Sequence, residues 1–103
     1  MSERFKPGTV EGTHIYFDPL PDDPKRRTRR WFVRSKHETD SDGDGLILTD
    51  IAWFGRWRKY AAQPRDGTIY EETCLREIAE FCEQRTREHR LRQRNGVTEP
   101  GWC

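Results

Sequence analysis

The sequence predicts an α+β domain in which a small antiparallel three-stranded sheet is followed by two consecutive helices packed on one face. Three observations lead to this prediction. An alternating apolar and polar run covers residues 29–36, an arc of aromatic residues recurs at helical spacing over residues 50–62, and an apolar stripe covers residues 72–82. Clusters of Pro, Gly and Asp separate these segments, as is typical of the loops of one domain.

The length of 103 residues indicates one domain. We expect this α+β domain over residues 13–92, with flexible tails over residues 1–12 and 93–103, because both ends contain Pro and Gly and few apolar residues. Only 32% of the residues are hydrophobic, whereas 36% are charged. The core therefore has to depend on few side chains, chiefly Trp, Tyr and Phe.

Three short segments predict the strands. The first is the β-prone run at residues 14–17, which a Pro-rich loop follows. The second is residues 29–36, where Trp31 and Val33 share one face. The third is residues 45–48, which follows an Asp- and Gly-rich turn and should pair with the second strand as a hairpin.

The first predicted helix covers residues 50–62 and ends before Pro64. At about 100° per residue, Trp53, Trp57 and Tyr60 fall on one arc of a helix, and strand alternation fits this segment poorly. We therefore expect both Trp side chains to be buried in the core.

The second predicted helix opens with two Glu residues, which suit the positive end of the helix dipole, and continues past residue 85. Cys74, Ile78 and Phe81 lie on its apolar face. The same face then becomes charged, so the last two turns should project into solvent. Cys74 and Cys82 are about 12 Å apart along this helix, too far for a disulfide.

Composition and motifs limit the function classes. The net charge of +1 excludes the strongly basic nucleic-acid binders, so a nucleic-acid site would depend on local clustering. No apolar run reaches the roughly 20 residues of a membrane span, and the first residues lack the apolar stretch of a signal peptide. We expect a cytoplasmic protein without a membrane partner. Because HExxH, CxxC and GxSxG motifs are absent, we expect neither an enzyme nor a cofactor.

Basic residues accompany aromatic residues in two places, just before Trp31 and within the first predicted helix. This combination is used to follow a phosphate backbone and to stack bases. The candidate nucleic-acid-binding residues are Lys25, Arg26, Arg27, Arg29, Arg30, Arg56 and Lys59. The alternative is that the first cluster is a solvated loop and that the second covers the core with its side-chain stems.

The run Asp40-Ser-Asp42-Gly-Asp44-Gly matches the start of an EF-hand calcium loop, with carboxylates at positions 1, 3 and 5 and Gly at position 6. Position 12 of such a loop needs a bidentate carboxylate, and Ile51 stands there instead. We expect a solvated hairpin loop without a metal. A weak calcium site at Asp40, Asp42 and Asp44 is the alternative.

The pattern W-F-x-R-W-x-x-Y at residues 53–60, followed by a turn and C-L-x-x-I-A-x-F at residues 74–81, resembles small uncharacterised proteins of actinobacterial phages of the mycobacteriophage type. The match covers about a third of the chain. The chain departs from the pattern at residues 61–63, where bulkier aromatic residues are usual. The resemblance implies a phage-encoded accessory protein in the cytoplasm of the infected host, but it transfers no activity.

The near-zero net charge favours a competing function, a protein–protein interaction module. The projecting end of the second predicted helix, or a face of the sheet, would bind a host or phage protein, including a virion component, or a second copy in a homo-oligomer. The candidate residues for this interface are Arg85, Arg87, His89 and Arg92.

Overall fold

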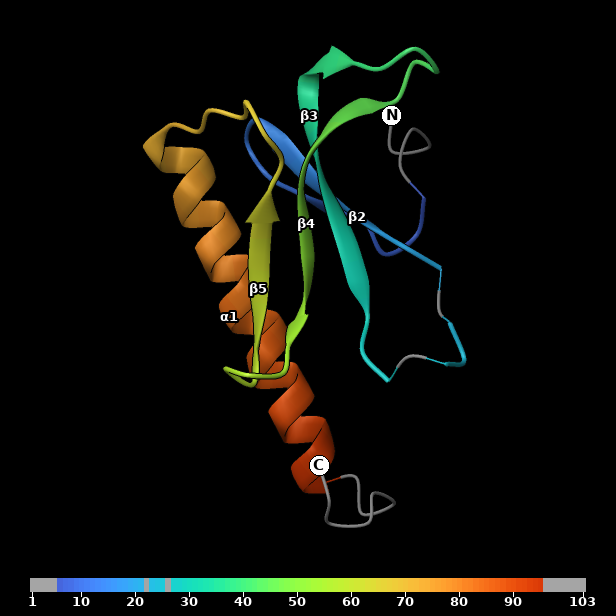
Figure 1. Cartoon of the computed structure of the whole chain (residues 1–103), viewed down its shortest axis with the longest axis vertical. Helices are drawn as coiled ribbons and strands as arrows, with labels where there is room; N and C mark the ends of the chain where they lie inside the picture. The colour runs from blue at the N-terminus through green and yellow to red at the C-terminus, as the bar shows by residue number, and fades with distance from the viewer. Residues whose placement is uncertain (1–5, 22, 26, 96–103) are drawn as a thin grey trace.

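The computed structural model describes residues 6–21, 23–25 and 27–95, which form a five-stranded antiparallel sheet and one long helix (Figure 1). The elements are β1 (Val10–Glu11), β2 (Ile15–Pro19), β3 (Arg30–Thr39), β4 (Gly45–Phe54), β5 (Lys59–Pro64) and α1 (Glu72–Asn95). The strands pair in sequence order, so each one lies beside the strand that precedes it in the chain. Helix α1 crosses one face of the sheet, and its C-terminal end extends beyond the strands (Figure 1).

The core lies between α1 and the face of the sheet that α1 covers. The rings of Phe17 and Phe81 stack with centroids 4.0 Å apart, and Trp31 meets the Phe81 ring edge-on at 5.1 Å. Burying each large apolar side chain contributes roughly 1.5–3 kcal/mol, so a small core of this kind can hold the domain together. The buried hydrophobic residues are Ile15, Phe17, Trp31, Val33, Ile51, Tyr60, Cys74, Ile78 and Phe81.

The alternation predicted for residues 29–36 is confirmed. Trp31 and Val33 are buried, whereas Arg34 lies on the opposite, open face of the sheet, where it pairs with Asp18. The predicted hairpin with residues 45–48 is also present, since β3 pairs with β4. The pairing continues much further than predicted, to the partners Arg30 and Ala52.

The prediction of a three-stranded sheet with two helices is wrong, because residues 50–62 form the end of β4, a turn and most of β5. Trp53 and Tyr60 are cross-strand partners, so both side chains lie on the helix-covered face. The chain reverses between them at Arg58, whose φ is 57°. Trp57 lies in this turn with 63% of its surface exposed, so the prediction that it belongs to the core is also wrong.

The second predicted helix is confirmed as α1, which begins at Glu72 and continues past residue 85. Cys74 is buried and Cys82 is half-buried, and both are free thiols. Burial raises the pKa of the Cys82 thiol to about 11, so it stays protonated near neutral pH. Among the described residues, no helix is long and apolar enough to cross a membrane.

The two predicted tails fall partly outside the described residues, namely at residues 1–5 and 96–103. Within the first tail, Val10 pairs with Phe17 at the edge of the sheet. At the other end, α1 extends to Asn95. The domain boundaries at residues 13 and 92 stay predictions.

Candidate nucleic-acid interface

Members of the two basic segments, Lys25 and Arg27 of the first and Arg58 of the second, lie around one pocket at one end of the molecule. There the β2–β3 loop, the β4–β5 turn and the C-terminal half of α1 surround a pocket of about 640 Å³, which we call the basic pocket. Four of its lining residues are cationic, and no acidic side chain of the described residues lines it. The lining residues are Lys25, Arg27, Thr28, Trp53, Arg58, His89, Arg90 and Gln93.

An aromatic wall forms one side of the basic pocket. The Trp53 ring lies 4.3 Å from the ring of His89 and 5.3 Å from that of Tyr60, measured between centroids. Tyr60 is itself buried against the core. The wall is therefore fixed by packing, and the exposed cations of the pocket stand beside a half-buried aromatic surface.

Hydrogen bonds hold the three segments around the basic pocket in place. The Arg90 side chain donates to the Arg58 carbonyl oxygen at 3.1 Å and so ties α1 to the β4–β5 turn. The Arg29 backbone N–H donates to the Tyr60 hydroxyl at 3.3 Å and ties the β2–β3 loop to β5. In α1, the buried Thr86 hydroxyl accepts the Tyr60 backbone N–H at 2.9 Å.

The pKa of the Tyr60 hydroxyl depends on its burial and on the charges at this end of the molecule. Burial raises its pKa, while the Arg29 N–H and the positive charges of Arg92, Arg29 and Arg85 oppose that rise. The phenol is therefore neutral near neutral pH, and three arginines contribute positive potential where the elements meet.

The β4–β5 turn, which contributes Arg58 to the basic pocket, also presents a second aromatic group. The exposed Trp57 ring packs edge-on against Phe54, with centroids 4.6 Å apart. Arg56, Arg58 and Lys59 are exposed in the same turn. An exposed indole among cations is suited to stack on a nucleic-acid base while the cations contact phosphate groups.

The predicted nucleic-acid-binding residues occupy three different places. Lys25 and Arg27 of the β2–β3 loop are exposed and line the basic pocket. Arg29 of the same loop, and Arg56 and Lys59 at the β4–β5 turn, are exposed but are not among its lining residues. Arg30 points instead to the open face of the sheet, 3.5 Å from the carboxylate of Asp50, and Arg26 lies outside the described residues.

The sequence prediction misses the contributions of Arg58, Arg90 and His89 to the basic pocket. It includes neither arginine among its nucleic-acid-binding residues, and it places His89 at a protein interface. The sequence does show that basic residues continue to the end of the helix. It does not show which strands and turns that end of the helix contacts.

The predicted protein-interaction residues do not form one exposed surface. Arg85 lies over the Phe81 ring at 4.8 Å, pairs with Glu88 at 2.8 Å and is only 16% exposed. His89 packs against Trp53. Arg87 and Arg92 are exposed.

The Asp-rich segment is the loop of the β3–β4 hairpin. The Asp40 carboxylate accepts the backbone N–H groups of Asp42 at 2.9 Å and Asp44 at 3.0 Å, and Gly43 adopts a φ of +86°. Turn formation therefore accounts for Asp40 and Gly43 without calcium. Within the part of the chain that the structure describes, no group of three His, Cys, Asp or Glu side chains is arranged to hold a metal ion.

No family model, curated protein or solved structure matches the chain. The resemblance to phage proteins therefore stays a prediction.

Proposed function

We propose that this protein is a non-enzymatic nucleic-acid-binding accessory protein that contacts a single strand through the basic pocket and the adjacent Trp57. One observation carries the proposal. Cations from three separate segments converge on one aromatic wall, and no acidic side chain of the described residues lines the pocket between them.

The low net charge limits the expected affinity for nucleic acid and its dependence on salt. With a net charge of +1, the whole molecule exerts little long-range attraction on a polyanion, so binding depends on the local cations. Four lining cations can contact about four phosphates, which predicts a slope of about −3 when the logarithm of the association constant for a single strand is plotted against that of the salt concentration. Stacking a base on Trp57 would add about 1–3 kcal/mol.

The proposal is tested by fluorescence anisotropy with labelled oligo-dT and oligo-U strands over a range of salt concentrations. We expect saturable binding with the slope given above. Arg58→Glu should weaken binding about tenfold at low salt and make the slope shallower by roughly 0.7, since it removes one phosphate contact.

Arg76→Glu is the matched control, because Arg76 is exposed on the N-terminal half of α1, away from the basic pocket. This variant makes the same charge change and should bind like the unmodified protein. An absence of binding at low salt, or equal losses in the two variants, would contradict the proposal.

A protein partner is the second candidate, favoured by the C-terminal end of α1. Leu91 is 46% exposed there, close in the sequence to the exposed Arg87 and Arg92. An apolar side chain among arginines is typical of the anchors of protein interfaces. For a second copy as the partner, sedimentation velocity should show dimers that Leu91→Glu abolishes; a monomer at all concentrations would exclude self-association.

A further inference from the structure

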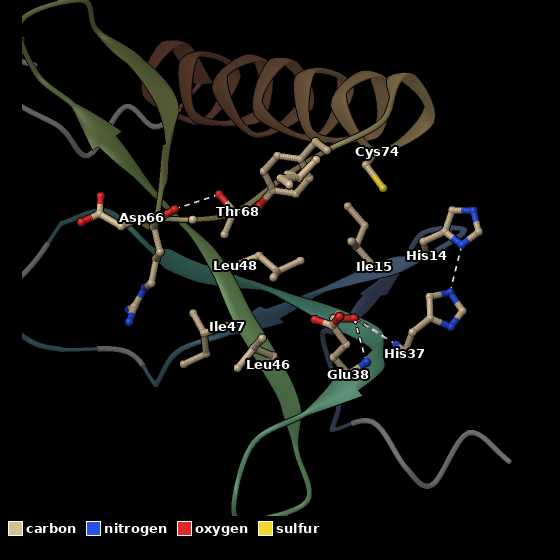
Figure 2. A pocket seen from close by; sticks show the side chains of 15 residues that line it. His14, Ile15, His37, Glu38, Leu46, Ile47, Leu48, Asp66, Thr68 and Cys74 are labelled. Atoms are coloured by element: carbon tan, nitrogen blue, oxygen red, sulfur yellow. Dashed lines mark hydrogen bonds between the residues drawn. The ribbon is translucent and has the colours of Figure 1, made fainter.

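Two histidines face each other at the end of the sheet opposite to the basic pocket. The Nδ1 atom of His14 lies 3.0 Å from the Nε2 atom of His37, and the ring centroids are 5.2 Å apart (Figure 2). His14 directly precedes β2 and His37 belongs to β3. Both side chains are exposed, so solvent ions can reach them.

The backbone beneath both histidines is held by hydrogen bonds. The N–H and hydroxyl of Thr13 donate to the Glu77 carboxylate of α1 at 3.0 and 2.7 Å, which fixes the segment that enters β2. The His14 carbonyl accepts the Lys36 N–H at 3.0 Å. The His37 N–H donates to the hydroxyl of the buried Ser35, also at 3.0 Å. The backbone positions from which the two rings project are therefore set by the fold before any ion binds.

The distance between the two nitrogens fits a shared metal ion. Two nitrogens about 2.1 Å from one ion are about 3.0 Å apart in neighbouring octahedral positions and about 3.4 Å apart in the tetrahedral geometry that Zn²⁺ prefers, so Zn²⁺ requires the rings to separate slightly. Imidazole nitrogen favours Zn²⁺, Ni²⁺, Co²⁺ and Cu²⁺ over Ca²⁺ and Mg²⁺, which prefer oxygen. We propose that His14 and His37 together bind one divalent ion of this first-row transition-metal class, with water in the remaining coordination positions.

Binding requires a change of tautomer but no net loss of a proton. In the hydrogen-bonded pair, one ring donates its N–H to the nitrogen of the other ring. For both facing nitrogens to offer a lone pair, the donating ring has to carry its proton on its other nitrogen. Small rotations of the two exposed rings would then point both lone pairs at the ion.

A pocket of about 580 Å³ adjoins the histidine pair and leaves space for the water ligands (Figure 2). Cys74 also lines this pocket, but burial raises the pKa of its thiol, which therefore stays protonated near neutral pH. We therefore assign no ligand role to Cys74. This metal site does not depend on the proposed nucleic-acid binding, which uses the other end of the molecule.

Isothermal titration of the full chain with Zn²⁺ and with Ni²⁺ tests this proposal. We expect one equivalent of either ion to bind and Ca²⁺ to give no heat. His14→Ala and His37→Ala should each weaken binding by more than about tenfold, because each leaves a single exposed imidazole. Circular dichroism melts should show that both variants fold, since neither side chain is buried.

Two control variants separate the histidine pair from other ligands. Asp42→Asn with Asp44→Asn removes the acidic loop residues, and Cys74→Ser removes the thiol; both should bind the ions as before. No heat with either ion would overturn the proposal. Binding that survives the loss of both histidines, or that disappears in either control variant, would overturn it as well.

Discussion

Arginine lies beside aromatic rings in two regions of this molecule, the basic pocket and the open face of the sheet. On the open face, Arg34 and Arg65 lie 5.4 and 5.7 Å from the centroid of the Phe32 ring. Both also pair with carboxylates there, Arg34 with Asp18 at 2.8 Å and Arg65 with Asp50 at 3.0 Å. In the basic pocket, none of the described lining residues is acidic.

This difference shows that an arginine beside an aromatic ring does not by itself define a binding surface. The carboxylates of the open face already neutralise its cations, so a phosphate group would have to compete with them. The basic pocket brings together four cationic side chains from three segments of the chain. Three variants test this contrast between the two regions, and they are described in order of decreasing expected effect.

Trp31→Ala should have the largest effect, because both regions depend on the same core. Trp31 is buried and meets the Tyr60 and Phe81 rings edge-on, so its loss should lower the free energy of unfolding by about 3–5 kcal/mol. Urea unfolding followed by circular dichroism measures this change. Phe32→Ala is the control, since Phe32 is a half-buried neighbour on the open face and should cost about 1 kcal/mol. Equal losses would show that the two faces do not differ as described.

Trp57→Ala should have the next largest effect, and on binding alone. Loss of stacking predicts an affinity for oligo-dT that is roughly 5- to 150-fold lower, corresponding to about 1–3 kcal/mol. The free energy of unfolding should change by less than about 0.5 kcal/mol, because Trp57 is mostly exposed. Anisotropy and urea unfolding measure the two quantities. If Phe32→Ala lowered affinity as much, the open face would be part of the interface.

Asp50→Asn should have the smallest effect and should make the open face more like the basic pocket. Asp50 pairs with both Arg30 and Arg65, so its neutralisation leaves these two cations without that carboxylate. We expect oligo-dT affinity at low salt to rise about two- to fivefold and stability to fall by at most about 1 kcal/mol. Glu80→Gln is the control. It removes one negative charge at an exposed position of α1 and should leave the affinity for oligo-dT unchanged. Equal gains in the two variants would show that only net charge matters.

The sequence allowed β2, β3 and α1 to be predicted, because their apolar residues follow a clear period. It found only residues 45–48 of β4 and missed the rest of β4 and all of β5. The buried side chains of β4 include Thr49, whose hydroxyl bonds to that of Tyr70, and this polar residue hides the strand alternation. Trp53 and Tyr60 lie seven residues apart, a spacing that suits one helix face and also a cross-strand pair around a turn.

The basic clusters of the candidate site could be found in the sequence, but their convergence could not. It depends on the path of α1, which brings Arg90 to the Arg58 carbonyl 32 residues away. The same holds for the histidine pair. His14 and His37 are 23 residues apart and meet because Ile15 pairs with Ser35 in the β2–β3 register.

The hydrogen bond from the Tyr60 N–H to Thr86 also affects how this molecule can meet other chains. Strand β5 is the outermost strand on its side of the sheet, where an exposed N–H would invite a foreign strand to extend the ladder. Because Thr86 of α1 already accepts from that donor, a foreign strand cannot form a backbone hydrogen bond with the Tyr60 N–H, and pairing with β5 is hindered at this end of the strand.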